Sequence, residues 1–312
     1  MKAVRCCDGQ VHVANVAEPA GEGVLVNVRS AGICGSDLHM LEKGFRIPGT
    51  LGHEVAGTLA DGRAVALEPL APCGHCDMCM RGEYFSCRLG AGMLYGVGRD
   101  GGMAEKIRVP ERCIVPLPAN VSAADACLVE PLAVAVHGIN RVHLEPGSRV
   151  AIVGAGAVGL AAAAVLTSRV RQVCIAARHD AQKEAALRLG AALEPEGEFD
   201  VVVECAGNSG ALAKAARLCR PGGVILLLAT YWEDVKLPAA DICMKSLSIH
   251  ASFLYGRQGL VRDVEAAACL MANRPELAEI LITHRLPLDA AQEAFALAAN
   301  RQGGAIKVVL EP

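Results

Sequence analysis

The chain has 312 residues, of which 53% are hydrophobic and 20% are charged. This length and apolar content suit one large or two ordinary domains with buried cores, which excludes a mainly disordered chain. The 30 Lys and Arg residues against 33 Asp and Glu give a net charge of −3, which argues against a general nucleic-acid or anionic-membrane binder.

Cysteine is abundant, with 14 residues, but the chain starts MKAVRCCDGQVHVANV, without the basic and then apolar leader of a secretory signal. Metal ligands and buried free thiols are therefore favoured over a disulfide framework. The uncharged stretch 150–168 contains three glycines, which favours a strand, a turn and a helix over a membrane span. We expect a soluble cytoplasmic protein with no membrane or nucleic-acid partner.

The first hundred residues are predicted to be mostly β, because short runs rich in Val and Leu alternate with Gly, Pro and Asp. The predicted strands are 2–5, 23–30, 54–59 and 64–67.

A cysteine, a histidine and carboxylates lie in separate motifs of this half. Cys34 stands in GICGSDLH, His53 and Glu54 in GHE, and Glu130 in EPL. Such a donor set with one open position is typical of catalytic zinc, which polarises an alcohol or carbonyl oxygen. Spacing alone does not establish this site, because an isolated Cys or His is more often a packed core residue.

A four-cysteine motif, C-x2-C-x2-C-x7-C, follows in CGHCDMCMRGEYFSC. It places Cys73, Cys76, Cys79 and Cys87 within one short segment. Four thiolates complete a tetrahedral zinc shell and leave no position for substrate, so we predict a structural zinc site. The alternatives are unligated thiols or a redox pair.

From about residue 146, apolar runs alternate with helix-like segments. Strands are predicted at 150–153, 173–176, 201–204 and 224–228, and helices at 181–189 and 210–219, with a turn at 221–223. This βαβα order predicts a doubly wound parallel sheet, an α/β fold. Helices at 260–273 and 289–300 and a strand at 305–310 follow.

The sequence GAGAVG lies between the first of these strands and an alanine-rich helix. Gly154 allows a tight turn, Gly156 lets the backbone approach a pyrophosphate, and Gly159 lets helix and strand pack closely. This context predicts a dinucleotide site. The alternative is a glycine-rich packing turn.

The tip of the next strand bears on which dinucleotide binds. It reads Ala177, Arg178 and His179 where an acid for the ribose of NAD is expected. A small residue followed by a guanidinium suits a 2′-phosphate, which favours NADP over NAD. Asp180 could instead reach the ribose, and Arg178 could be an ordinary surface charge.

The order of these motifs resembles the zinc-containing medium-chain alcohol dehydrogenase family, in particular its polyol, threonine and sugar dehydrogenase branch. The matching motifs are C-x-S-D-x-H, GHE, the four-cysteine segment, EPL before the glycine loop, and ITHRLP near residue 285. The resemblance implies a mostly β GroES-like catalytic domain of residues 1–131, completed by 256–312, and a Rossmann domain of residues 132–255.

The resemblance also implies roles for individual residues. Cys34 and His53 would bind a catalytic zinc, Glu54 would be a further ligand or exchange with water, and Glu130 would act at the metal directly or through water. Asp37 would orient His53, and Ser36 would pass the substrate proton through the cofactor ribose toward His39. The residues expected at the cofactor are Gly154, Gly156, Ala157, Val158, Gly159, Ala177, Arg178, His179, Cys205, Leu228, Ala229, Leu254 and Tyr255.

We therefore expect a zinc-dependent oxidoreductase, with two zinc ions per chain, that moves a hydride between NADP(H) and a secondary alcohol or ketone, such as a polyol. The family's habit implies a homodimer or homotetramer. Gln182 stands where relatives often have an arginine that binds the cofactor, and the short interval between Glu54 and Cys73 weakens substrate inference by analogy. Alternatives are an NAD-dependent member, a reductase without catalytic zinc, or a non-enzymatic dinucleotide sensor.

Overall fold

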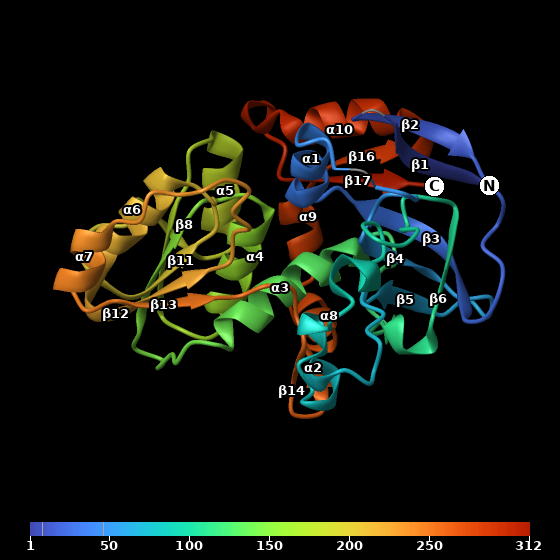
Figure 1. The fold of residues 1–312 in the computed structure, drawn as a ribbon. Coiled ribbons are helices and arrows are strands. Elements are labelled where there is room, and N and C mark those ends of the chain that lie inside the picture. The colour runs from blue at the N-terminus through green and yellow to red at the C-terminus, as the bar shows by residue number, and fades with distance from the viewer. Residues whose placement is uncertain (8, 46) are drawn as a thin grey trace. The chain divides into compact units, whose positions relative to one another are not determined.

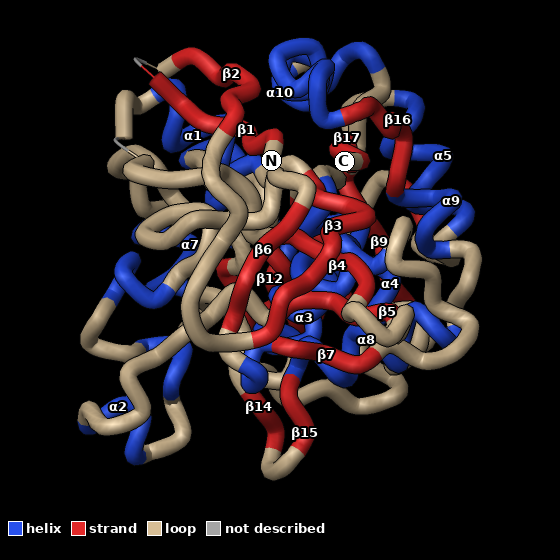
Figure 2. The backbone as a smooth tube through the Cα atoms, turned by 90° about the vertical axis from the view of Figure 1, so that its right-hand side faces the viewer, coloured by secondary structure: helices blue, strands red, loops and turns tan. Residues whose placement is uncertain are grey.

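The computed structural model describes residues 1–7, 9–45 and 47–312 (Figures 1 and 2). The chain divides into two compact units, one made of residues 1–130 and 256–312 and the other of residues 131–255. A search of the described helices finds none with the length and apolar character that crossing a membrane requires.

The unit of residues 131–255 is built on a six-stranded sheet whose neighbouring strands all run parallel. The strand order is β10-β9-β8-β11-β12-β13. This order confirms the predicted Rossmann-type doubly wound sheet. The strands are β8 (Arg149–Val153), β9 (Gln172–Ala176), β10 (Ala192–Leu193), β11 (Phe199–Glu204), β12 (Cys219–Leu227) and β13 (Ser248–Ala251).

Helices connect these parallel strands. The chain leaves β8 toward β9 through α4 (Ala157–Leu166) but leaves β11 toward β12 through α6 (Ser209–Leu218). Right-handed crossovers in opposite directions place α4 and α6 on opposite faces of the sheet (Figure 1). Alanine dominates α4, which favours helix and lets it pack closely on the strands. The other helices are α3 (Val129–Ile139), α5 (Asp180–Arg188) and α7 (Ala239–Met244).

The other unit holds a seven-stranded sheet in which the end of the chain pairs with its beginning. β17 lies between β16 and β3, and the order continues through β4 and β5 to β7, while β6 also pairs with β3. Figure 2 shows β17 and β3 side by side. The strands are β3 (Val24–Gly32), β4 (Glu54–Thr58), β5 (Ala64–Leu67), β6 (Lys106–Val109), β7 (Ile114–Pro116), β16 (Ile282–Pro287) and β17 (Lys307–Glu311).

Smaller elements complete this unit. They are the hairpin of β1 (Lys2–Cys7) and β2 (Gln10–Asn15), the pair β14 (Arg257–Gln258) and β15 (Val261–Arg262), and helices α1 (Gly35–Glu42), α2 (Asp77–Met80), α8 (Asp263–Asn273), α9 (Leu277–Leu281) and α10 (Ala291–Ala299).

Two sequence-based expectations are corrected here. The helix predicted from residue 260 begins at Asp263, because residues 257–262 form a hairpin and the Asp263 carboxylate accepts the Gly256 N–H at 2.8 Å. The turn predicted at 221–223 lies within β12, where Gly222 takes a left-handed φ of +70° and the register with β11 shifts.

Candidate metal and dinucleotide sites

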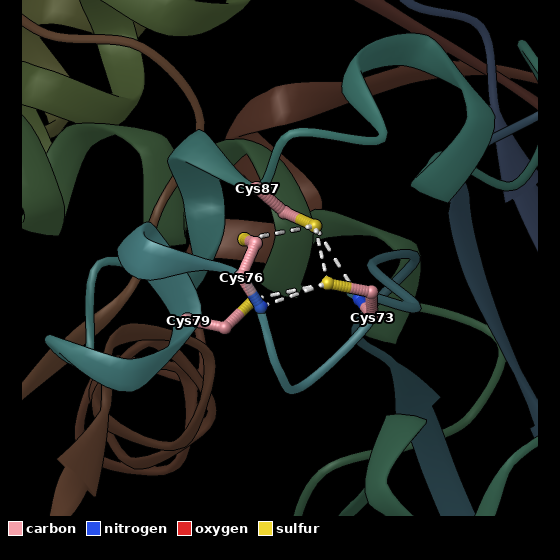
Figure 3. Close-up of side chains that lie close together, drawn as sticks. All are labelled: Cys73, Cys76, Cys79 and Cys87. Carbon is pink, nitrogen blue, oxygen red and sulfur yellow. Dashed lines mark hydrogen bonds between the residues drawn. The ribbon is translucent and has the colours of Figure 1, made fainter.

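The four cysteines of the C-x2-C-x2-C-x7-C motif converge around one point (Figure 3). Sulfur to sulfur, Cys73 lies 3.9 Å from Cys79 and 3.6 Å from Cys87, and Cys76 lies 3.9 Å from Cys87. A tetrahedral zinc bound to four sulfurs would separate them by about 3.8 Å. The segment therefore has the dimensions of a zinc–tetrathiolate site.

Local folding brings the thiols together and favours the charged form of Cys76, although burial raises the pKa of Cys79 to about 12. Gly74 has a φ of +81°, which allows a tight turn after Cys73, and Cys76 is the N-cap of α2. Backbone N–H groups of Arg88 and Cys79 lower the pKa of Cys76 to about 6. The thiolate is the form that binds metal, so these amide groups suit the segment to zinc.

Cys34, His53 and Glu54 form a second cluster, with one ligand atom from each within 4.8 Å of the others. Their approach follows from strand pairing, because β3 and β4 are antiparallel neighbours with Gly32 opposite Glu54. Cys34 follows β3 as the N-cap of α1, and His53 immediately precedes β4. The sheet register thus brings residues 19 positions apart to one site.

Asp37 and Ser36 surround the His53 ring. The Oδ1 atom of Asp37, which is fully buried, lies 3.6 Å from His53 Nδ1, while its Oδ2 accepts the Cys34 N–H at 3.0 Å. Ser36 Oγ lies 3.5 Å from His53 Nε2. His39 lies further along α1, half-exposed, with Nδ1 3.6 Å from the Glu42 carboxylate.

Glu54 has a partner that the sequence analysis missed. The Lys307 ammonium, from β17, lies 2.6 Å from both Glu54 carboxylate oxygens and donates to the Ile33 carbonyl at 3.1 Å. Both side chains are 2% exposed or less. A Cβ on Gly32 would lie 2.1 Å from Glu54 Oε2, so only glycine leaves room for this carboxylate. A single lysine within the apolar run AIKVVL could have indicated from the sequence that this cation is buried and paired.

Glu130 lies in the first turn of α3 and is 6% exposed. Burial alone would lower the pKa of His53, but the charges of Asp37, Cys34 and Glu130 together raise it well above its usual range. This excess of negative groups around an imidazole suits a divalent cation. The residues present therefore fit zinc.

The glycine loop is a tight turn whose backbone is closely packed on one side and open on the other. Gly154 has a φ of +105°, and a Cβ on Gly159 would lie 1.9 Å from the Gly154 carbonyl oxygen. A Cβ on Gly156, the N-cap of α4, would meet no atom within 4 Å, so space lies in front of the helix N-terminus. Free N–H groups and the helix dipole favour an anion there. Ala157 and Val158 form the first turn of α4.

Two charged residues follow β9, and in the described part of the chain Asp180 forms an ion pair whereas Arg178 does not. Ala177 is half-buried, and Arg178 is exposed with no hydrogen bond or ion pair among the described residues. His179 caps α5 together with Gln182, which is 7% exposed. Asp180 is in the first turn of α5 and pairs with Lys183 at 3.1 Å.

The remaining predicted cofactor residues lie after the carboxyl ends of the strands of the same sheet. Cys205 follows β11, and Leu228 and Ala229 follow β12. Leu254 follows β13 with a left-handed φ of +58°, and the Tyr255 side chain is fully buried. Two further residues at this edge, Glu204 and Tyr231, were not singled out from the sequence.

Comparison with known proteins gives two family models that match consecutive parts of the chain. Residues 20–119 match the alcohol dehydrogenase GroES-like domain, and residues 123–311 match the glucose dehydrogenase C-terminus.

Individual relatives match over nearly the whole chain. L-galactonate-5-dehydrogenase from Escherichia coli K12 is 29% identical and covers 89% of this chain and 88% of its own length. D-xylulose reductase A from Aspergillus oryzae is 30% identical and covers 87% and 85%. A structure from Sinorhizobium meliloti 1021, described as a zinc-binding dehydrogenase and bound to NADP, has a TM-score of 0.87 and 29% identity over 100% of this chain and 99% of its own.

Proposed function

The chain belongs to the zinc-containing medium-chain alcohol dehydrogenase family, and from this we propose that it interconverts a hydroxylated secondary alcohol and its ketone with NADP(H). The observation that carries the proposal is the donor set of Cys34, His53 and Glu54 in a chain that also has a dinucleotide-type glycine loop. The family is one of zinc-dependent oxidoreductases. The cofactor preference, the substrate and the residue roles are our inference.

In this proposal Cys34, His53 and Glu54 hold the catalytic zinc, and Glu130 acts on it directly or through a water molecule. When bound, the ion supplies a Lewis acid that polarises the substrate oxygen. Asp37 holds the ring of His53 in orientation from its Nδ1 side. Ser36 takes the substrate proton, and half-exposed His39 passes it to solvent.

We assign a second, structural zinc to Cys73, Cys76, Cys79 and Cys87. The proposal is supported by their sulfur separations of 3.6 to 3.9 Å. A shell of four thiolates has no open position, so this ion would contribute to folding and not to chemistry.

The preference for NADP is proposed from the residues after β9. Arg178 is exposed and has no protein partner among the described residues, so its guanidinium is available to a 2′-phosphate. The competing acid, Asp180, pairs with Lys183 in the first turn of α5, which weakens the case that it binds a ribose hydroxyl. The solved relatives hold either cofactor, NADP in the Sinorhizobium meliloti structure and NADH in one from Escherichia coli with 26% identity, so the preference rests on Arg178.

A polyol or sugar acid is the proposed substrate class. It is supported by Glu130, buried near His53, and by relatives named for L-galactonate and D-xylulose.

We also propose that the chain forms a homodimer or homotetramer. All four residues of the edge strand β13 are exposed, and Ile249 and the following Phe253 expose 40% and 59% of their surface. An uncovered strand edge with apolar side chains favours pairing with another chain. Light scattering of the purified protein measures the assembly directly, and a monomer would overturn this part of the proposal.

The test of the function is a panel of polyols, sugar acids and their ketones, followed at the nicotinamide absorbance with NADP(H) and NAD(H), before and after chelation. We expect turnover with NADP(H) that is lost on chelation and returns with zinc. Turnover that survives complete removal of zinc would favour a reductase without catalytic metal. Dinucleotide binding without turnover on any compound would favour a sensor.

A further inference from the structure

The unit of residues 131–255, which we call the dinucleotide unit, contains a buried carboxylate that has no role in the proposed reaction. Glu204 is the last residue of β11 and is 0% exposed. No Lys, Arg or His forms an ion pair with it in the part of the chain that the structure describes. A buried charge without a countercharge destabilises the folded state unless hydrogen bonds stabilise it. The hydrogen-bond donors around Glu204 therefore indicate which segments this carboxylate holds together.

The donors come from two different turns at the carboxyl edge of the sheet. Oε1 accepts the N–H groups of Ala206 at 2.7 Å and Gly207 at 2.9 Å, in the turn after β11. Oε2 accepts the hydroxyl of Tyr231, in the turn after β12, at 2.6 Å. Burial and then the charge of Glu204 raise the pKa of Tyr231 above its usual range, so its hydroxyl stays protonated and donates.

The backbone of Glu204 holds the second turn as well. Its carbonyl oxygen accepts the N–H groups of Leu228 at 2.9 Å and Ala229 at 3.1 Å. One residue thus fixes the turn that follows its own strand and the turn that follows the neighbouring strand.

The glycine loop rests on the same arrangement. A Cβ on Gly154 would lie 3.0 Å from both the Cβ and the N atom of Ala206, and one on Gly207 would lie 2.9 Å from the Thr230 carbonyl oxygen. The loop after β8 and the turns after β11 and β12 are therefore in backbone contact. A shift in the turn after β12 would therefore press on the turn after β11 and, through Ala206, on the glycine loop.

We propose that Glu204 and Tyr231 are positioning residues for the dinucleotide, because their hydrogen bond holds these three turns in the conformation that binds it. The inference rests on the proposed function. A site held in its binding conformation loses less conformational freedom when its ligand arrives, so the bond acts on affinity.

The chain supplies its own probe. Trp232 is the single tryptophan and is adjacent to Tyr231, so selectively excited tryptophan emission reports on this turn. The test compares Tyr231→Phe with wild-type full-length, zinc-loaded protein. NADPH and NADH are titrated by quenching of Trp232 emission, and acrylamide quenching is measured without cofactor.

We expect Tyr231→Phe to raise the Kd of NADPH about tenfold, the effect of losing one hydrogen bond to a buried charged group. Acrylamide should also quench Trp232 more strongly. The matched control is Tyr84→Phe, whose hydroxyl donates to the buried Glu68 at 2.7 Å in the other unit. It should lower the melting temperature and leave the Kd unchanged.

Glu204→Gln is the second variant, because its NH2 would face either the two N–H donors or the Tyr231 hydroxyl, and each orientation loses an acceptor that the carboxylate supplies. It should weaken NADPH binding similarly even if Tyr231→Phe folds poorly. Wild-type protein that binds NADPH together with variants of unchanged Kd would overturn this inference alone. Wild-type protein that binds neither dinucleotide would overturn the proposed function and this inference with it.

Discussion

Lys307 Nζ lies 2.6 Å from each carboxylate oxygen of Glu54, although 253 positions separate the two residues. Both are almost fully buried, and Glu54 also belongs to the cluster with Cys34 and His53. The carboxylate therefore pairs with a buried protein cation and also lies within 4.8 Å of the two other side chains proposed to bind the metal.

Replacing Lys307 with methionine should leave Glu54 as an uncompensated buried charge. Removing one partner of a buried pair costs about 3–5 kcal/mol, so we expect a loss of this order in urea unfolding of zinc-free protein. Zinc should restore part of it by supplying a positive charge. The exposed pair of Lys2 and Asp289 has the same 2.6 Å separation, and Lys2→Met should have no measurable effect. Equal losses for both variants would contradict the prediction.

A Cys76→Ser variant should lower the zinc content from two ions per chain to one, because it breaks the four-thiolate shell and leaves the Cys34 site intact. The remaining three ligands bind zinc less tightly, so the melting temperature should fall. Plasma mass spectrometry of dialysed protein gives the count. Cys243→Ser, at an exposed cysteine, is the control and should keep both ions. Two ions retained in Cys76→Ser together with an unchanged melting temperature would contradict the structural site.

Arg178→Ala should weaken NADPH binding and leave NADH binding unchanged, because only NADPH carries the 2′-phosphate. A charge-assisted, two-bond contact predicts a loss of about tenfold or more. Arg171→Ala is the matched control, since Arg171 is also exposed but precedes β9 instead of following it. Titration calorimetry with both dinucleotides measures the change. An equal loss of affinity for NADH would mean that Arg178 does not bind the 2′-phosphate.

Asp200 makes the folding stability of the dinucleotide unit depend on pH. The Arg149 N–H at 2.8 Å and then the Arg220 guanidinium at 2.7 Å lower the pKa of its carboxyl. A carboxyl with a depressed folded-state pKa contributes stability above its unfolded pKa of about 3.9, and loses it as pH falls through the folded value.

Asp200→Asn should therefore lower the urea midpoint at pH 7, and the difference from wild type should be smaller at pH 3 and continue to shrink as the pH falls through the depressed folded-state pKa of Asp200. Asp234→Asn, at an exposed acid of the same unit, serves as the control and should behave as wild type at both pH values. A difference that persists unchanged in acid would assign the effect to packing instead of charge.

The sequence predicted the parts of the site that depend on local pattern. The glycine loop between β8 and α4 was predicted because a strand, three glycines and a helix form one continuous segment. The four cysteines were predicted because 15 residues contain the whole motif. In both cases the interacting groups are close in the chain.

The approach of Cys34 to His53 depends instead on the pairing of β3 with β4, and only the family resemblance suggested it. The contact of Lys307 with Glu54 could not be predicted, because it depends on the pairing of β17 with β3, which no local sequence pattern specifies. Glu204 was missed because the apolar sequence of its strand does not indicate that the carboxylate accepts a hydrogen bond from the turn that follows the strand.

The pairing of β17 with β3 also constrains the order of assembly on the ribosome. Residues 131–255 are contiguous and can fold as soon as they emerge, whereas the seven-stranded sheet that carries Glu54 is complete only after β16 and β17 have been added. During synthesis the Glu54 side chain therefore lacks its ammonium partner for the whole time needed to add 253 residues. The unit of residues 131–255 can therefore finish folding before the other unit, whose sheet is completed only when β17 has been synthesised.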